Sequence, residues 1–478
     1  MGNYSVPEEI RAMKPKGTIV KKIKGQYYVY SHSQSKDLKT GKWKTDPGKL
    51  LGKIIPGVGY TPNDKTCETQ GVTCFDYGQY LLACKLGIED FSLLKECFTP
   101  EEAMQIFALA VIFCVEGYVG LKAAGLIYER CLIARDYPAL KFSSRRMSKL
   151  LERIGRIGKK EEFQQKCIEK GSDVMAIDGH VIPTSSENNN LSSFGYKTKQ
   201  IGSEYMNLMM AMDVKSHFPV GVHVFPGYML DKKDFIDFSS GIGSLKGKII
   251  LLDMGFFSTE NMNFITSQEG NYVIPVSENR ADYKEISSPR KGRVAQFLYH
   301  RNRKVDTVEY REMKKDNRKI VYYRNISEAE KLSSAYLLSL EQGKPGFSKE
   351  NYNVMKQSFG VIVLETNLED DAKTVYELYK TRWTIETFYD RLKNGIHFEE
   401  LNLDDYATAQ GVAFVMLLAG RIDARILDAA KKLKMTRKEL IQLMSFLKLS
   451  DNGKISSIHN IKKLHKEIFH ELDRKSVV

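Results

Sequence analysis

Short apolar runs that end in an aspartate constrain the fold of this chain more than any other feature. Residues 173–276 contain VMAID, MNLMMAMD, VGVHVF, IILLD and NYVIPV, separated by stretches with helical periodicity. Apolar runs of this length read as buried strands, and their alternation with helices predicts an α/β domain with a mixed sheet. Asp178 and Asp253 follow two of the runs, so each is expected at a sheet edge. Taken singly, an aspartate after a strand is more often a turn former, which is the interpretation for Asp173 and Asp213.

A second feature is a long helix expected from Leu368 to about Asn394. At about 100° per residue, Tyr379, Arg382, Glu386 and Lys393 fall inside one stripe about 60° wide. Ile385, Phe388 and Leu392 lie on the opposite side and are expected to anchor the helix to a core. For an arbitrary helix, a glutamate between arginine and lysine is most simply a solvated row of ion pairs.

The spacing of these four residues resembles the Tyr-Arg-Glu-Lys signature of bacterial insertion-sequence transposases with a DDE catalytic site. VMAIDGHVIP and IILLDMGFFS precede the helix in the order of that family's other motifs. FGYKTKQ, FPGYMLDKKDF and VLETN are also similar to its connecting segments, so the resemblance covers about 145 to 420. It implies an RNase H-like catalytic core.

The resemblance implies that Asp178 lies on the first core strand, Asp253 after the fourth, and Glu386 on a helix beside them. These three would be both the catalytic residues and the ligands of two Mg²⁺ ions, which Mn²⁺ would replace. Mg²⁺ prefers hard oxygen ligands, and two ions about 3.5 to 4 Å apart can activate an attacking oxygen and stabilise a leaving one. Tyr379, Arg382 and Lys393 would contact phosphates near the cleaved end.

The implied reaction has two steps and needs double-stranded DNA as terminal inverted repeats and as target. Water frees a 3′-hydroxyl at each element end, and that hydroxyl then attacks target DNA. Pairing of two ends implies a homodimer or higher oligomer. The alternatives are a nuclease or resolvase that cuts without joining and a non-catalytic DNA-binding descendant of a transposase.

Some positions depart from the family pattern. Met254 follows Asp253 where arginine is common, and His180 stands where threonine is common. Some relatives stack a flipped base on a tryptophan of the insertion, but this chain has only Trp43 and Trp383. A hairpin intermediate would therefore need a substitute, for which the candidates are Phe297, Tyr299 and Tyr310.

Six segments are expected. They are a basic arm with a small hairpin (1–62), a helical DNA-binding region (63–172), the first part of the core (173–278), a basic β-rich insertion (279–350), the second part of the core (351–405) and a helical tail (406–478). The candidate DNA contacts outside the core are Lys21, Lys22 and Lys24 in the arm, Arg145 and Arg146 on a helix, and Arg301 and Arg303 in the insertion. Solvated basic faces explain these clusters equally well.

The charge distribution fits a polyanionic partner. The net charge is +13, and residues 1–53 and 290–324 each hold twelve Lys/Arg against four Asp/Glu. No secretory signal or membrane span is evident, and GIGSLKG at 241–247 precedes a strand, unlike a phosphate-binding loop, so no nucleotide cofactor is implied. A cytoplasmic, nucleoid-associated protein of a prokaryote is expected.

Overall fold

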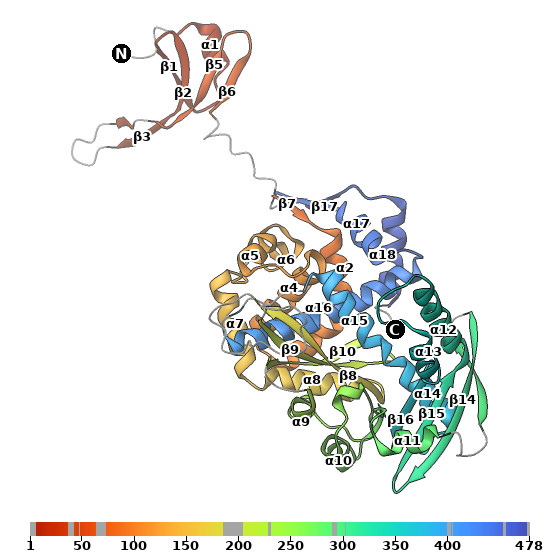
Figure 1. The fold of residues 1–478 in the computed structure, drawn as a ribbon. Coiled ribbons are helices and arrows are strands. Elements are labelled where there is room, and N and C mark those ends of the chain that lie inside the picture. Colours follow the sequence, from red (N-terminus) through yellow and green to blue (C-terminus); the bar gives the residue numbers. More distant parts are fainter. Residues whose placement is uncertain are drawn as a thin grey trace. The chain divides into compact units, whose positions relative to one another are not determined.

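The computed structural model describes residues 6–36, 43–46, 48–63, 73–184, 204–227, 231–288, 294–301, 303–398, 403, 405–452 and 456–475. Contacts group the chain into two compact units (Figure 1). One contains Met1–Cys74 and Leu449–Ile458, and the other contains Phe75–Lys448 and His459–Val478. Most of the boundaries expected from sequence therefore mark changes of element type inside the larger unit.

The smaller unit is a folded antiparallel sheet where the sequence suggested an arm with one hairpin. Its sheet has the order β1-β2-β5-β6, and a short helix packs on it. The expected hairpin is present, and Lys24 and Gly25 both have positive φ, which suits a tight two-residue turn. The elements are α1 (Glu8–Ala12), β1 (Thr18–Ile23), β2 (Gln26–Ser31), β5 (Leu50–Ile55) and β6 (Gly59–Pro62), with a separate ribbon of β3 (Ser33–Lys36) and β4 (Trp43–Asp46).

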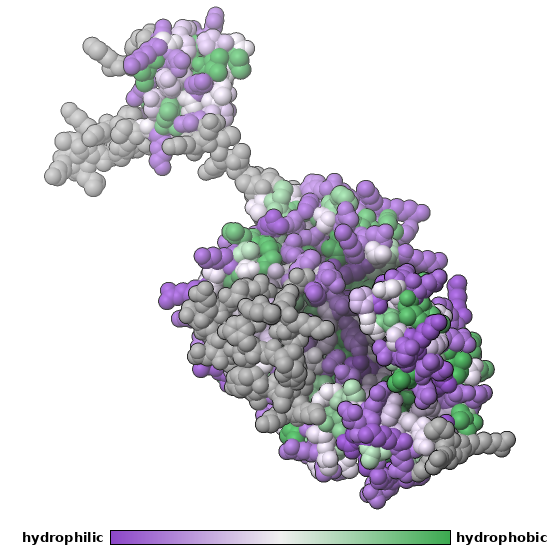
Figure 2. Space-filling model, in the orientation of Figure 1, coloured by the Kyte–Doolittle hydropathy of each residue, from purple (hydrophilic) through white to green (hydrophobic). Residues whose placement is uncertain are grey.

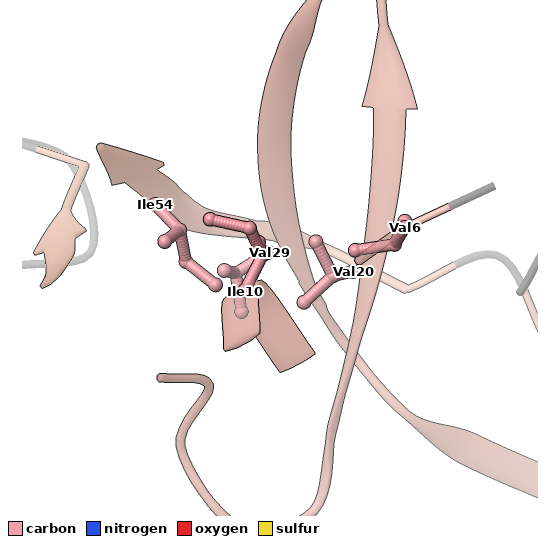
Figure 3. Close-up of a cluster of buried hydrophobic side chains, with 5 residues drawn as sticks. All are labelled: Val6, Ile10, Val20, Val29 and Ile54. Atoms are coloured by element: carbon pink, nitrogen blue, oxygen red, sulfur yellow. The ribbon is translucent and has the colours of Figure 1, made fainter. Parts of the chain in front are cut away.

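A small apolar core explains why this segment folds. Val6 and Ile10 come from the helical side, and Val20, Val29 and Ile54 come from three neighbouring strands (Figure 3). All five side chains are buried, and removing such groups from water is the main driving force for folding. A further three-stranded sheet has the order β18-β17-β7 and contains β7 (Thr73–Asp76), β17 (Lys448–Asp451) and β18 (Ser456–His459).

The larger unit is built on a nine-stranded mixed sheet of order β10-β9-β8-β11-β12-β16-β15-β14-β13. In its first five strands β8, β9 and β10 are antiparallel neighbours, while β11 and β12 run parallel to β8. This arrangement agrees with the RNase H-like α/β class expected from sequence. The strands are β8 (Val174–Thr184), β9 (Glu204–Asp213), β10 (Phe218–Pro226), β11 (Ile249–Leu252), β12 (Asn271–Pro275), β13 (Ala295–Arg301), β14 (Lys304–Lys315), β15 (Arg318–Asn325) and β16 (Val361–Thr366).

The region expected to be a β-rich insertion extends this same sheet. Strands β13, β14 and β15 continue it antiparallel beyond β16, and the KDNR segment makes the β14–β15 turn at Asp316 and Asn317. The region also contains α11 (Ala281–Ser287), α12 (Ile326–Glu341) and α13 (Lys349–Met355).

A long helix, α16 (Tyr406–Lys432), runs through the core of this unit. Most of its residues are buried, and it packs on α7 (Ser144–Arg156) so closely that a Cβ on Gly411 would lie 2.1 Å from the Leu151 carbonyl oxygen. Residues 406–432, expected to begin a helical tail, therefore form a central helix that packs against both the helical region and the sheet. The other helices are α2 (Gly78–Leu86), α3 (Ile88–Cys97), α4 (Pro100–Glu116), α5 (Leu121–Arg130), α6 (Leu132–Asp136), α8 (Lys159–Lys170), α9 (Asp231–Ile242), η1 (Met254–Phe256), α10 (Thr259–Ser267), α14 (Ala372–Thr381), α15 (Trp383–Ile396), α17 (Arg437–Ser445) and α18 (Lys463–Lys475).

Helix α4 is the most apolar helix of the core. It begins at the expected place, where Thr99 and Glu102 form a capping box ahead of Pro100. In the described part of the chain, no single helix is both long and apolar enough to cross a bilayer. The pair α4 and α5, bent by 93°, meets the criteria of length and composition only when taken together.

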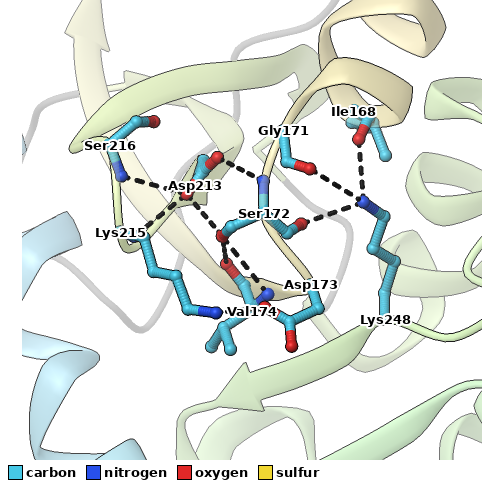
Figure 4. Close-up of polar contacts among 9 residues, drawn as sticks. All are labelled: Ile168, Gly171, Ser172, Asp173, Val174, Asp213, Lys215, Ser216 and Lys248. Carbon is cyan, nitrogen blue, oxygen red and sulfur yellow. Dashed lines mark hydrogen bonds and ion pairs between the residues drawn. The ribbon is translucent and has the colours of Figure 1, made fainter.

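A polar network fixes the start of β8 (Figure 4). The Asp213 carboxylate accepts hydrogen bonds from the backbone N–H and the hydroxyl of Ser172, both at 2.7 Å, and from the Lys215 N–H at 2.9 Å. Lys248 donates to the Ser172 carbonyl oxygen at 2.9 Å, and Asp173 pairs with the Lys215 side chain. Asp213 thus has the turn-forming role expected of it and helps to hold the start of β8, whereas Asp173 precedes the strand and makes an exposed ion pair with Lys215.

Candidate functional site

Two aspartates lie beside each other, where strand β11 ends and the parallel strand β8 continues. In the register of β11 with β8, Leu252 is the partner of Ile177. Asp178 and Asp253 are the next residues along the chain, and neighbouring strands are only about 4.8 Å apart. Asp253 comes directly after β11 as expected, but β8 continues from Asp178 to Thr184, so the turn expected after Asp178 is not present. Both positions are half-buried, because each follows a run of fully buried residues. The apolar strands therefore bring together two carboxylates that are 75 residues apart in sequence.

The long helix expected from sequence is two helices, α14 and α15, that meet at Arg382. The backbone of Arg382 remains helical, with φ −52° and ψ −31°, but its N–H donates to the Tyr379 carbonyl oxygen, three residues back. This tighter turn ends α14 and begins α15. Ile385, Phe388 and Leu392 anchor α15 in the core, as the apolar side of the stripe indicated.

Arg382 links Glu386 to Asp178. Its guanidinium donates to Oδ2 of Asp178 at 3.4 Å and also to Oε1 of Glu386. Burial disfavours the charged form of Arg382, but Asp178, Asp253 and Glu386 help to hold its pKa above the ordinary value. Tyr379 is buried, and its ring centroid lies 5.9 Å from the same guanidinium. The structure thus brings Asp178, Asp253, Glu386, Arg382 and Tyr379 together.

The environment of Asp178 opposes its negative charge. Burial, together with the charges of Asp253 and Glu386, raises the pKa of this carboxyl to about 6. Arg382 and the Gly179 N–H, which donates to Oδ1 at 2.8 Å, act in the other direction. A partly buried carboxylate beside two others is stabilised by a cation, which here is the guanidinium.

The donor set has the chemistry that suits a hard divalent cation. Asp178, Asp253 and Glu386 offer carboxylate oxygens, the ligands that Mg²⁺ prefers. Among the described residues, no three carboxylate, imidazole or thiol groups stand close enough to hold one ion as placed. The contact of Arg382 with two of the carboxylates gives a physical reason, since the guanidinium occupies oxygens that a metal would use.

Sequence reasoning missed a contact that holds the helix against β8. Tyr389, on α15, donates its hydroxyl to the Asp178 carbonyl oxygen at 2.9 Å, and its ring stacks on His180 at 4.7 Å between centroids. Tyr389 follows Glu386 by three residues, so helical spacing alone offered a weak signal. Lys393 is exposed on the same helix, and its charge adds to burial in lowering the pKa of His180.

The remaining candidate DNA contacts lie outside this cluster. In the smaller unit, Lys21 and Lys22 lie over the rings of Tyr30 and Tyr27 at 5.1 and 5.6 Å, and Lys24 is in the hairpin turn. Within the larger unit, four exposed arginines are on other elements. They are Arg145 and Arg146 on α7, Arg301 at the end of β13, and Arg303 in the turn before β14.

The three aromatic residues considered as base-stacking substitutes pack together. Phe297 contacts Tyr310 and Tyr323, and Tyr299 contacts Tyr376 edge-on at 5.2 Å. These rings therefore help to form the core between the extended sheet and α14.

Comparison with known proteins agrees with this geometry. The family model described as "Transposase DDE domain" matches residues 169–419, which include all of the residues in the cluster. No curated protein matches the sequence. A solved structure of a piggyBac transposase synaptic complex with hairpin DNA is similar over 77% of this chain and 80% of that chain, with 10% identity and a TM-score of 0.40. The family match confirms the resemblance seen in the motifs, and this chain belongs to the DDE transposase domain family.

Proposed function

We propose that this chain is a transposase that cuts the ends of its own insertion sequence and joins the 3′-hydroxyl ends to target DNA. The observation that supports this most is the register of β8 and β11, which places Asp178 beside Asp253, together with the Arg382 bridge to Glu386. The family match supports DNA transposition as the general activity. A site of three convergent carboxylates suits phosphoryl transfer and requires no serine or cysteine nucleophile.

Asp178, Asp253 and Glu386 would hold two Mg²⁺ ions, with Mn²⁺ as a substitute. When bound, such ions activate the attacking oxygen and stabilise the leaving one. Arg382 and Lys393 would then bind the phosphates next to the reacting bond, since guanidinium and ammonium groups form strong charge-assisted hydrogen bonds to phosphate. Tyr379 would hold Arg382 in position through ring contact and would offer its hydroxyl to the same phosphates.

The chemistry proceeds in two balanced transfers. In the first, a water oxygen bonds to phosphorus at the element end, the bond to the 3′-oxygen breaks, and the released strand ends in a 3′-hydroxyl. In the second, that hydroxyl bonds to a target phosphorus and displaces a new 3′-oxygen there. The first step hydrolyses a phosphodiester to a 5′-phosphate and a 3′-hydroxyl, with a proton of the water passing to the 3′-oxygen, and the second exchanges one phosphodiester bond for another. Neither step needs an external energy source. Synapsis of two ends requires two copies of the protein.

The test is a cleavage and joining assay with the purified full-length protein. The substrate is a duplex that carries an inverted repeat taken from the DNA flanking the coding region, incubated with Mg²⁺, Mn²⁺ or EDTA. We expect metal-dependent release of a 3′-hydroxyl end and its joining to a plasmid. Asp253→Asn should abolish both products, whereas Asp173→Asn, at an exposed carboxylate, should abolish neither.

Two outcomes would favour the rival functions. Cleavage without joined product from a pre-cleaved end would indicate a nuclease or resolvase. Binding without either product, unchanged in the Asp178, Asp253 and Glu386 variants, would indicate a non-catalytic DNA-binding protein.

A further inference from the structure

A groove lies next to helix α15, on a different face of the helix from the one that carries Glu386. It has a volume of about 300 Å³ and is lined by residues of α14, α15 and α16, by Arg301 at the end of β13 and by His217. Relative to Glu386, the lining residues Trp383, Thr387 and Arg391 lie about 60°, 100° and 140° around the axis of α15. The groove is thus separate from the stripe that carries Glu386.

The groove lining carries more positive than negative charge, although three of its cations have acidic partners. Lys380 pairs with Glu328, Arg391 with Asp423 and Lys431 with Asp428. Four of its lining side chains are cations and one, Asp428, is a carboxylate; the cations are Arg301, Lys380, Arg391 and Lys431. They come from four different elements, so the charge results from the tertiary fold and is not a row along one helix. Figure 2 shows a hydrophilic hollow in the larger unit over the part of α15 labelled in Figure 1.

Two observations indicate that the groove takes an anionic ligand with a flat or apolar portion. Arg391 pairs with the buried Asp423 at 3.7 Å, and burial lowers its pKa, but its Nε has no hydrogen-bond acceptor among the described residues. A buried donor without an acceptor is costly unless a ligand satisfies it. Trp383, whose side chain is 59% exposed, adds an aromatic surface on which a sugar or base can rest.

We propose that this groove binds the phosphodiester backbone of DNA that continues away from the reacting phosphate. The inference rests on the proposed function, which brings DNA to Glu386. With side chains a helix is about 10 to 12 Å across, so a strand leaving the carboxylates reaches the groove within about four nucleotides. Contacts to phosphates carry no sequence information, so the groove serves DNA of any sequence.

The two possible sources of that backbone are the flanking DNA of the element end and the target DNA. The test variant is Arg301→Gln/Lys431→Gln, because both side chains are exposed and their loss leaves the fold intact. The control is Lys246→Gln/Lys314→Gln, which removes the same charge from exposed lysines that pair with Glu269 and Glu369, away from the groove.

The primary measurement is binding of a random-sequence 40-base-pair duplex by the full-length protein across a series of salt concentrations. Each lost phosphate contact lowers the slope of log affinity against log salt by about one, so we expect a decrease of about two for the groove variant. The control should keep the wild-type slope. An unchanged slope in the groove variant overturns the proposal, and so does an equal decrease in both variants.

Two reactions then identify the source. Loss of cleavage at an end with flanking DNA assigns the groove to the flank, and loss of joining from a pre-cleaved end assigns it to the target. Normal rates of both would contradict the proposal. Failure of the proposed function would give a different result, because the wild-type protein would then produce neither cleaved nor joined DNA. The dependence of DNA affinity on salt would still show whether the groove binds phosphates.

Discussion

Arg382 donates a hydrogen bond to the carboxylate of Asp178 across 3.4 Å, although 204 residues separate them in the chain. The same guanidinium contacts Glu386, so one side chain neutralises part of a cluster in which three carboxylates meet. Like charges gathered in this way repel each other, and a cation is required to relieve that repulsion. Arg382 supplies it in the protein alone, and we infer that divalent ions take over this role when DNA and metal are bound.

If divalent ions replace Arg382 as the counter-ion of the carboxylates, stability measurements on Arg382→Gln can test this without an activity assay. Loss of the guanidinium leaves Asp178 and Glu386 without their counter-ion, and we expect the free energy of unfolding in EDTA to fall by about 1 to 3 kcal/mol. Excess Mg²⁺ should raise the melting temperature of the variant more than that of the wild type. Equal shifts in the two proteins would show that the guanidinium and the metal do not share these oxygens.

The hydrogen bond from Tyr389 to the Asp178 carbonyl oxygen should position the helix against the strand. Tyr389→Phe is expected to cost about 1 kcal/mol of stability and to lower the cleavage rate, because α15 loses its attachment next to Asp178. Tyr128→Phe is the matched control, since the Tyr128 hydroxyl donates in the same way to the Tyr137 carbonyl oxygen at 2.8 Å. A similar loss of rate in both variants would mean that stability alone explains the effect.

The close contact of α16 with α7 predicts that glycine-to-alanine substitution destabilises the protein at this contact but not at an open helical position. Gly411→Ala would place a methyl group 2.1 Å from the Leu151 carbonyl oxygen, so we expect a loss of about 3 kcal/mol in chemical denaturation. Gly395→Ala, within α15, has nothing within 4 Å of the added carbon and should be neutral or slightly stabilising. Wild-type stability of Gly411→Ala would contradict the close packing of these helices.

His223 should make stability depend on pH. Burial and the nearby charge of Lys160 lower its pKa to about 3, and its Nε2 lies 2.9 Å from the Tyr406 hydroxyl. Between pH 6.5 and pH 3 the unfolded chain binds the proton more readily, so this contribution is fully present above pH 6.5 and is lost as pH falls, by at most about 1.4 kcal/mol per pH unit.

Unfolding titrations of His223→Gln from pH 7 to pH 4 test this expectation. The variant should lose less stability than the wild type over that range. The same substitution at the exposed His300 should leave the wild-type pH dependence in place. Identical pH profiles for His223→Gln and the wild type would contradict the argument.

Local sequence patterns were sufficient for the parts of the site that depend on periodicity. Apolar runs before Asp178 and Asp253 predicted strands, and parallel pairing then places the two residues together. The predicted strand end is found before Asp253, but β8 continues past Asp178 to Thr184. The interval of four residues between Arg382 and Glu386 predicted that they share a helical face, which their ion pair confirms. The hydroxyl bond of Tyr389 could not be predicted in this way, because it depends on how α15 docks against β8.

The misread regions show where local patterns fail. Residues 406–432 were assigned to a tail, yet their glycine and alanine content allows α16 to approach other elements closely inside the core. The N-terminal segment was interpreted as an arm with a small hairpin because it mixes Lys, Gly and Tyr and has a short alternating strand signal at Gln26 to Tyr30. Its core is formed by five buried residues, among them Val20 and Val29 on neighbouring strands. Burial of this kind depends on partners that are remote in sequence.

The central claim is that Asp178, Asp253 and Glu386 are metal ligands, and exchange of one ligand atom tests it most directly. A thiolate is a poor ligand for Mg²⁺ but is tolerated by the softer Mn²⁺. For Asp253→Cys we expect cleavage of the element end to fall at least about a thousandfold with Mg²⁺ and to recover at least about tenfold when Mn²⁺ replaces it. Cleavage at the wild-type rate with Mg²⁺, or the same loss with both metals, would contradict the claim that this side chain binds the ion.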